Sequence, residues 1–274
     1  TSSLAAARRA ARNGTPEAAD DVRAAMLAVR GVSRSFGALR AVENVSFDVA
    51  RGSITAVIGP NGAGKTTLFN LINGFEQLDR GSVAIFGVEV SSLSDEEIAR
   101  RGTSRTFQMP LTVHGLTMTE NVMCGAHRHL RRGVVATSLG LPGVLAEENA
   151  IRTRATACLA RAGLRPDIPV EQLSFGQQRQ LELARALALD PDLLLMDEPA
   201  SGLNDSETES LAKLIAAINA SGVTILLIEH DLRVVMGLAD KVVVLNYGEV
   251  IAQGSPDEVR RDPAVIAAYL GRDR

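Results

Sequence analysis

The sequence predicts an α/β fold built around one strand, a glycine-rich loop and the helix that follows it. Residues 53–58 form an apolar, β-branched run that breaks at once into the glycine-rich residues 59–67. Two later apolar runs, residues 192–199 and 222–231, lack polar alternation, which is typical of parallel strands buried on both faces. A helical pattern over residues 206–220 separates these runs, as expected for strand–helix–strand units.

The composition limits what kind of protein this can be. The chain has 274 residues, of which 46% are hydrophobic, and this is enough for a sizeable core. Aromatic residues make up only 3% and Trp is absent, so the core must be built from Leu, Val, Ile and Ala. The formal net charge of −3 argues against broad nucleic-acid binding, which needs a basic face. Cys124 and Cys158 lie far apart without metal-ligand spacing, so we expect buried free thiols in a reducing compartment.

No run reaches the roughly 18 apolar residues that a membrane-spanning helix needs. The nearest candidate, residues 133–146, is short and interrupted by Gly, Ser, Thr and Pro. Residues 1–24 are rich in Ala and Arg and lack the apolar segment of a secretory signal, so we expect a flexible tail there. We expect residues 25–274 to form a soluble domain, and any membrane role must come through a partner.

The glycine-rich loop fits the phosphate-binding pattern G-x-x-x-x-G-K-[ST], with Gly59, Gly64, Lys65 and Thr66 at the fixed places. These glycines and Gly62 allow positive φ angles, so successive N–H groups can point into one anion-sized hollow. A helix beginning near Thr66 adds its positive end, which favours the β-phosphate of a nucleotide. Lys65 then reaches the β- and γ-phosphates, and the Thr66 hydroxyl completes a Mg²⁺ shell.

Strands surround this loop in the sequence. Residues 27–32 and 42–49 have strand patterns, and residues 82–90 form another strand or a hairpin. Phe36 lies between the first two. An aromatic residue just before a phosphate-binding unit can stack on a purine, or it can pack within a hairpin, and the residues alone leave both readings open.

The middle of the chain, from residue 94 to residue 172, is predicted to be mainly helical. Residues 94–101 open with a plausible N-cap and early acidic residues, which predicts a short helix. Residues 103–108 form a strand-like run that ends in Gln108. A long helical section then covers residues 117–163, broken by the uncharged residues 133–143. This section is the inserted subdomain that we expect at about residues 109–172.

A second anion site is predicted where residues 173–179 precede a helix over residues 180–189. Ser174 and Gly176 lie at that helix start, where exposed N–H groups favour an anion. The sequence does not say whether this site faces the chain's own glycine-rich loop.

Ionisable residues follow the two buried strands. Asp197 and Glu198 end the run at residues 192–199, and His230 lies at the end of residues 222–231. Ligands of open α/β sheets bind at the carboxyl ends of the strands. We therefore expect all three side chains beside the phosphates.

The C-terminal part predicts a hairpin and two helices. Residues 241–245 and 249–253 are strands around a turn at residues 246–248, and helices follow at residues 256–261 and 263–270.

Together these stretches resemble the motif set of an ATP-binding cassette (ABC) ATPase, in the expected order and over nearly the whole chain. The resemblance implies a P-loop NTPase core with an antiparallel β subdomain and an inserted α-helical subdomain. The matching motifs are the P-loop at residues 59–67, the glutamine loop at Gln108, the signature loop at residues 173–177, the acidic strand at residues 193–198, the switch histidine His230 and the adenine-stacking position Phe36.

One branch is especially similar, namely the ATPases of importers for branched-chain and other hydrophobic amino acids. Residues 105–108, 197–204, 227–231 and 262–271 carry this likeness. ATPases of urea and amide importers look much the same, so urea and amides are the alternative solutes.

Two residues depart from the wider family. Phe175 stands at the third position of the signature loop, where glycine is usual, and Asn204 stands where many relatives have aspartate, although this branch commonly shows Asn there.

The resemblance implies roles for individual residues. Two cassettes close head to tail, and each ATP lies on one chain's Lys65 loop beneath the other chain's signature loop. Glu198 activates water, and His230 and Lys65 act on the γ-phosphate. The Mg²⁺ ligands implied are Thr66, Gln108 and Asp197. The implied ATP contacts are Phe36, Gly59, Asn61, Gly62, Ala63, Gly64, Lys65, Thr66, Thr67, Gln108, Ser174, Gly176, Gln177 and His230.

The implied partners are membrane permease subunits and a second ABC ATPase subunit, either a copy or a paralogue. A solute-binding protein takes part indirectly, no nucleic acid is expected, and the chain is placed on the cytoplasmic face of the cell membrane. A non-transport cassette protein is disfavoured because the sequence has one P-loop and no sustained heptads. A plain P-loop kinase or GTPase is also disfavoured, because neither class would account for the motif at residues 173–177.

Overall fold

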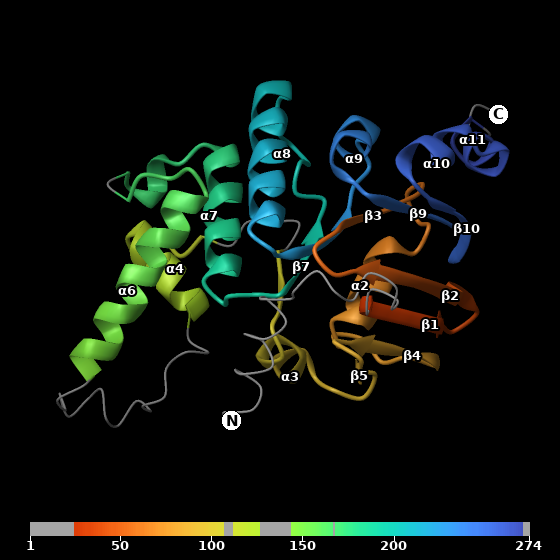
Figure 1. Cartoon of the computed structure of the whole chain (residues 1–274), viewed down its shortest axis with the longest axis horizontal. Helices are drawn as coiled ribbons and strands as arrows, with labels where there is room; N and C mark the ends of the chain where they lie inside the picture. Colours follow the sequence, from red (N-terminus) through yellow and green to blue (C-terminus); the bar gives the residue numbers. More distant parts are fainter. Residues whose placement is uncertain (1–24, 107–111, 127–143, 167, 271–274) are drawn as a thin grey trace, which may run out of the picture.

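The computed structural model describes residues 25–106, 112–126, 144–166 and 168–270. These residues form two β-sheets with helices packed against them (Figure 1). One sheet has the strand order β2-β1-β4-β5, and the other has the order β10-β9-β3-β8-β7-β6. This architecture confirms the predicted α/β fold with an antiparallel β subdomain.

The six-stranded sheet is parallel except for its edge strand β10. Residues of β7 alternate between two cores, because Leu194 and Met196 pack in the core of the helical layer and Leu193 and Leu195 in the core beneath the other sheet. Burial on both faces explains the continuous apolar runs in the sequence. The strands are β3 (Ile54–Ile58), β6 (Thr103–Arg105), β7 (Leu193–Asp197), β8 (Thr224–Ile228), β9 (Lys241–Asn246) and β10 (Glu249–Gly254).

The antiparallel sheet has longer strands than the sequence pattern predicted. The first two pair with each other as far as Phe36 and Leu39, beyond the expected residues 27–32 and 42–49. The backbone ladder therefore holds polar residues 33–35 in a strand, although they lack apolar alternation. The predicted hairpin at residues 82–90 is confirmed. The strands are β1 (Ala25–Phe36), β2 (Leu39–Ala50), β4 (Arg80–Ile85) and β5 (Val88–Glu89).

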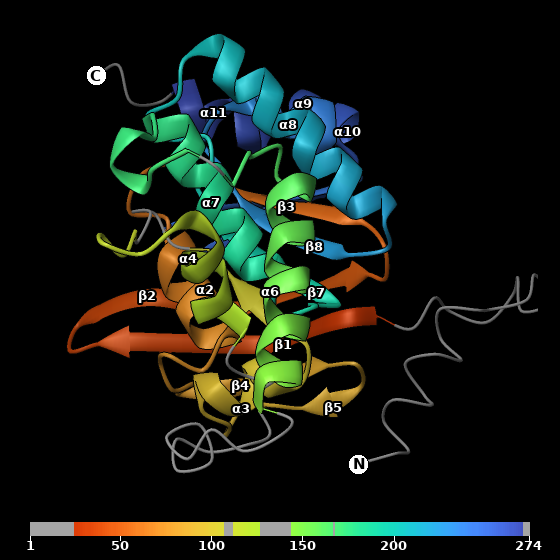
Figure 2. The ribbon, with the colours of Figure 1, turned by 90° about the vertical axis from the view of Figure 1, so that its left-hand side faces the viewer.

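Three helices form a layer that packs on one face of the six-stranded sheet (Figure 2). They are α4 (Met118–Gly125), α6 (Val144–Arg161) and α7 (Phe175–Leu187), with the short 3₁₀ helix η2 (Val170–Gln172) before α7. The start predicted for α7 at residue 180 was wrong. Ser174 caps the helix in a capping box with Gln177, so α7 begins at Phe175.

The other helices follow the predicted pattern with one exception. The sequence pattern did not predict α9 (Leu232–Leu238), a short helix that begins where the Asp231 side chain accepts the Arg233 N–H. Among the described residues, no helix is both long and apolar enough to cross a membrane. Cys158 is buried as expected, but Cys124 is exposed on α4. The remaining helices are α2 (Lys65–Ile72), α3 (Asp95–Arg100), α8 (Asp205–Ala220), α10 (Pro256–Arg261) and α11 (Pro263–Leu270).

Candidate functional site

The glycine-rich loop turns tightly between β3 and α2. Gly59 and Gly64 have φ angles of 153° and 97°. A Cβ atom on Gly59 would lie 2.1 Å from the Leu245 carbonyl oxygen, and one on Gly64 would lie 2.2 Å from that of Ala41. Neighbouring backbone thus leaves no room for a side chain at either position, so the loop can form only with glycine there.

This loop forms one wall of an open pocket that brings together half of the residues predicted to bind nucleotide, all of them from residues 61–67. The Lys65 side chain is 6% exposed, and its Nζ donates hydrogen bonds to the carbonyl oxygens of Gly59 (2.7 Å) and Pro60 (3.1 Å). An ammonium group held this way offers its charge to phosphate oxygens inside the loop. The pocket is lined by Leu39, Arg40, Ala41, Asn61, Gly62, Ala63, Gly64, Lys65, Thr66, Thr67, Glu198 and Tyr247.

Sequence reasoning missed four residues of this pocket, namely Leu39, Arg40, Ala41 and Tyr247. Tyr247 lies in the turn after β9, and its side chain is 82% exposed. That turn touches the loop because the Gly248 N–H donates to the Ala63 carbonyl oxygen (3.0 Å). The strand order supplies the missing signal, since β9 runs parallel to β3 and both end at the same edge of the sheet.

Asp197 lies at the end of β7 in a buried ion pair. Its Oδ2 is 3.0 Å from Arg105 Nη2, and the two side chains are 3% and 8% exposed. Arg105 Nη1 donates to Asn70 Oδ1 on α2 (2.7 Å). Burial raises the pKa of Asp197, while the Arg105 guanidinium opposes this shift. Arg105 therefore connects β6, β7 and α2, a role that the sequence pattern did not reveal.

The donor set fits Mg²⁺. Asp197 Oδ1 is buried and has no hydrogen-bond partner, so this carboxylate keeps one oxygen available as a ligand. Thr66 supplies a hydroxyl in the adjoining pocket. Mg²⁺ is usually held by one or two carboxylates together with substrate phosphates and water, and this arrangement needs no cage of protein ligands.

Glu198 and His230 lie side by side at the carboxyl ends of β7 and β8. His230 Nδ1 is 3.7 Å from Glu198 Oε2. Glu198 has a φ of 46°, in the left-handed region that is uncommon for residues other than glycine, and Pro199 follows it. A strained backbone that aims a carboxylate into a pocket is typical of a functional position.

Beneath this pair lies Glu229, which is fully buried. Its carboxylate accepts the N–H groups of Ala200 (2.8 Å) and His230 (3.0 Å). Burial raises the pKa of Glu229, and these N–H groups act in the opposite direction. Glu229 thereby fixes the loop after Glu198 to the backbone of His230.

The start of α7 lies outside the Lys65 pocket and carries three of the predicted nucleotide contacts, namely Ser174, Gly176 and Gln177. Ser174 accepts the Gln177 N–H (3.3 Å), and its own N–H donates to Gln177 Oε1 (2.9 Å), at the start of α7. None of the three lines the pocket around Lys65, and Figure 1 shows α7 and α2 in separate parts of the molecule. The predicted nucleotide contacts are thus divided between two regions of the chain.

Two further predicted residues need comment. Phe36 ends β1 with a side chain that is 44% exposed, and the Arg34 guanidinium lies 4.9 Å from its ring centre. It is not among the residues that line the pocket. Gln108 lies outside the described residues, and so does the start of the predicted insert.

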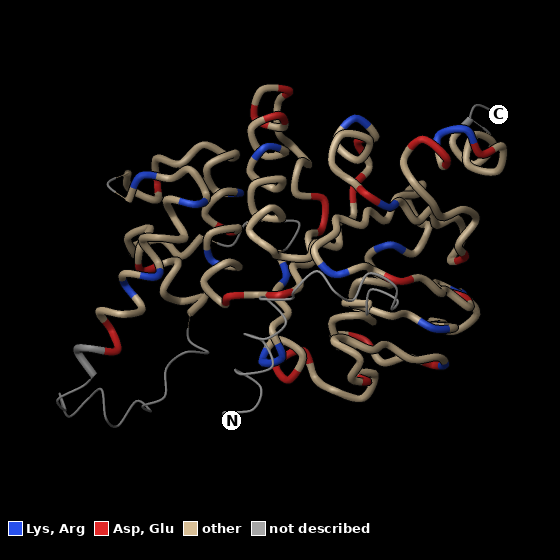
Figure 3. The backbone as a smooth tube through the Cα atoms, in the orientation of Figure 1, with Lys and Arg blue, Asp and Glu red and all other residues tan. Residues whose placement is uncertain are grey.

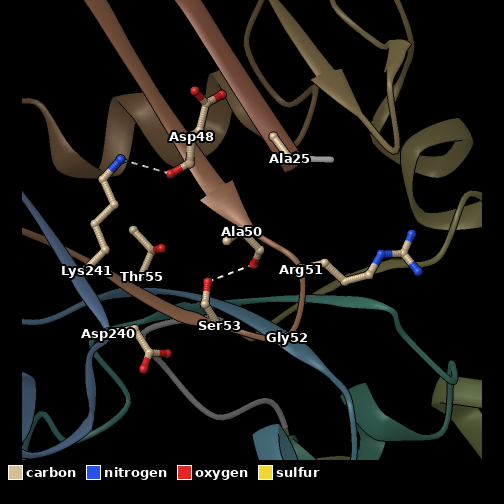
Figure 4. A pocket seen from close by; sticks show the side chains of 9 residues that line it. All are labelled: Ala25, Asp48, Ala50, Arg51, Gly52, Ser53, Thr55, Asp240 and Lys241. Carbon is tan, nitrogen blue, oxygen red and sulfur yellow. Dashed lines mark hydrogen bonds between the residues drawn. The ribbon is translucent and has the colours of Figure 1, made fainter. Parts of the chain in front are cut away.

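A second pocket lies at the opposite, amino ends of β3 and β9 (Figure 4). Two of its charged groups already bond to nearby backbone: Lys241 Nζ donates to the Asp48 carbonyl oxygen (3.2 Å), and Asp240 accepts the Ile54 N–H (2.8 Å). Burial lowers the pKa of Lys241. We therefore interpret this pocket as part of the packing between the two sheets and not as a ligand site.

Charges of both signs are interspersed along the described backbone (Figure 3). The positive charge that the phosphate site needs is therefore local, and Lys65 supplies it from within the loop.

Replacing Arg105 with Met is expected to lower the free energy of unfolding by about 3–5 kcal/mol, because the change leaves the buried Asp197 carboxylate unpaired. Urea denaturation measures this. The matched control is Arg100→Met, which breaks a solvent-exposed pair with Glu96 and is expected to cost about 0.3–0.5 kcal/mol. Equal losses in the two variants would show that the Arg105–Asp197 pair does not stabilise the fold.

The sequence of the chain is similar to those of ABC transporter proteins. Residues 42–201 match the family described as "ABC transporter", and residues 249–274 match "Branched-chain amino acid ATP-binding cassette transporter". The chain is 41% identical over 249 residues to the high-affinity branched-chain amino acid transport ATP-binding protein LivG of Salmonella typhimurium, covering 90% of this chain and 98% of that protein.

The similar solved structures are also ATP-binding cassettes of ABC transporters. A nucleotide-free ATP-binding cassette from an ABC transporter superposes with a TM-score of 0.79 at 30% identity, covering 90% of this chain and all (100%) of that one. A dimeric bacterial ABC transporter cassette gives a TM-score of 0.70 at 28% identity, covering 84% of this chain and 99% of that one.

Proposed function

Because the chain belongs to the ABC transporter family and is an ATPase of that family, we propose that it drives the import of branched-chain or other hydrophobic amino acids through a membrane permease. One observation carries the ATPase part, namely the pocket that brings Lys65 and Thr66 together with Glu198. The match of residues 249–274 to a branched-chain amino acid family supports the choice of solute.

We infer a site shared by two chains. The pocket lies open at the Lys65 loop, and Ser174 and Gly176 at the capped start of α7 do not line it. A head-to-tail dimer would cover the ATP on one chain with the α7 start of the other, whose N–H groups favour a phosphate. The solved relative described as a dimeric cassette supports the formation of a dimer.

Within that site the chain's own groups divide the work of phosphoryl transfer. Lys65 and the loop N–H groups bind the phosphates, and Thr66 and Asp197 would hold Mg²⁺, with Gln108 as a further ligand. Bound there, Mg²⁺ would supply positive charge that neutralises the phosphates. Glu198 accepts a proton from the attacking water, and His230 keeps Glu198 and the γ-phosphate in register. Phe36 stacks on the adenine.

Movement reaches the membrane through the helical layer in this proposal. Residues 109–172 form a subdomain inserted in the domain at residues 25–274, and Gln108 links it to the nucleotide. A short cytoplasmic helix of the permease then docks in a groove of this insert, on the cytoplasmic face of the membrane. Cross-linking tests the placement, and a permease that cross-links to β9 and β10 instead would contradict it.

Solute identity is tested by uptake. Cells of the source organism that lack this chain are expected to lose high-affinity uptake of radiolabelled leucine, isoleucine and valine, and to regain it with the wild-type chain. The Glu198→Gln variant serves as the control and is expected not to restore uptake. Loss of urea or amide uptake with normal leucine uptake would assign the chain to the related importers instead.

A further inference from the structure

Phe175 packs against the loop that follows Glu198. A Cβ atom on Gly202 in that loop would lie 2.9 Å from the Phe175 Cε1 atom. Gly202 also has a φ of 81°, so both the aromatic ring and the backbone favour glycine at this position. The residue that departs from the usual signature therefore has a defined partner in the same chain.

The ring is supported from its own helix. The Arg179 guanidinium lies 5.2 Å from the Phe175 ring centre, at a distance that allows a cation–π contact. Arg179 is 5% exposed and pairs with Glu182, with 3.5 Å between Nη1 and Oε2. A buried, paired arginine has little freedom to move, so it holds the ring toward the loop.

The loop in turn is bonded to the catalytic side. The Ser201 N–H donates to the Glu198 carbonyl oxygen (3.1 Å), and the Glu229 carboxylate accepts the N–H groups of both Ala200 and His230. A displacement of the Glu198 backbone therefore moves the loop against which Phe175 packs.

A second contact joins the same two segments. A Cβ atom on Gly176 would lie 2.8 Å from Glu207 Oε1 in the first turn of α8. Asn204 caps that turn by accepting the Glu207 N–H (3.0 Å). The start of α7 thus lies against both Gly202 and Glu207.

We propose that Phe175 is a positioning residue that couples the two ATP sites of the dimer, an inference that rests on the shared site proposed above. Phe175 holds the start of α7, which covers the ATP of the partner chain, against the loop of Glu198, which acts on the ATP of its own chain. The state of one ATP thereby changes how well the other is covered, and this is a coupling between sites.

The test compares ATP hydrolysis against ATP concentration in the full chain for wild type, Phe175→Gly and the control Ile266→Ala, an equally exposed position on α11. Wild type and control are expected to show a Hill coefficient above 1, with an upper limit of about 2 for two coupled sites. Phe175→Gly is expected to fall to about 1. The affinity of the single chain for a fluorescent ATP analogue, measured at protein concentrations too low for dimers, is expected to stay unchanged, because Phe175 does not line the Lys65 pocket.

A double-mutant cycle with Gly202→Ala separates coupling from general damage. The added methyl group meets the ring in wild type but finds space in Phe175→Gly, while the backbone strain is the same in both. Gly202→Ala is therefore expected to lower the Hill coefficient only when Phe175 is present. Additive effects, or a cooperative Phe175→Gly variant, would overturn the coupling role. A wild-type coefficient of 1 would also overturn the coupling, whereas the dimer itself is tested separately by light scattering of the Glu198→Gln variant in saturating ATP.

Discussion

Replacing Glu198 with Gln is expected to lower ATP turnover about 10²- to 10⁴-fold while ATP binding is retained. The loss follows from removal of the proton acceptor, since a positioned general base contributes a factor of this size. Glutamine keeps the shape and the left-handed backbone at this position, so the pocket around Lys65 stays intact. Phosphate release under saturating Mg²⁺ and ATP measures turnover, and equilibrium dialysis measures binding.

The control for this variant is Glu209→Gln on α8, where the carboxylate is solvent-exposed and paired only on the surface with Lys213. That variant is expected to hydrolyse ATP at the wild-type rate. Normal turnover in Glu198→Gln would remove Glu198 from the catalytic role and leave His230 without a partner in the reaction.

Replacing Lys65 with Ala is expected to weaken ATP binding about ten- to hundredfold. A hydrogen bond to a charged group is worth about 1.5–3 kcal/mol, and about 1.4 kcal/mol corresponds to a tenfold change in affinity. Lys65 Nζ is held inside the glycine-rich loop by two of its carbonyl oxygens. Its charge therefore acts on the phosphates that this loop is expected to bind, and not on the adenosine part of ATP. Titration calorimetry with ATP and with adenosine measures this loss of affinity, and the affinity for adenosine is expected to change little.

Lys213→Ala is the matched control, since Lys213 is an exposed lysine outside the pocket. Melting temperatures of both variants show whether the loop still folds. An unchanged ATP affinity in a folded Lys65→Ala variant would contradict the phosphate-binding role of this loop.

The sequence predicted well where Asp197, Glu198 and His230 lie, because strands buried on both faces have continuous apolar runs that are easily identified. Continuous apolar runs that end in Asp197, Glu198 and His230 place those side chains at one edge of the sheet, and the structure brings Glu198 and His230 within 3.7 Å of each other. The glycine pattern was equally informative, since steric exclusion by Leu245 and Ala41 leaves glycine alone at two of its positions.

Other features depend on contacts between distant segments, which one sequence does not record. Arg105 resembles any strand residue until β6 and β7 are paired, and only then does it reach Asp197 and Asn70. Tyr247 resembles a turn residue until β9 is placed beside β3. Phe175 reads as a departure from a motif until Gly202 is brought against its ring.

The dependence of the ATP hydrolysis rate on protein concentration tests the shared site most directly. We predict that the wild-type rate rises more than linearly with concentration, and that light scattering finds the Glu198→Gln variant as a dimer in saturating ATP. A rate strictly proportional to concentration, together with a monomeric variant that binds ATP, would contradict a site built from two copies of this chain.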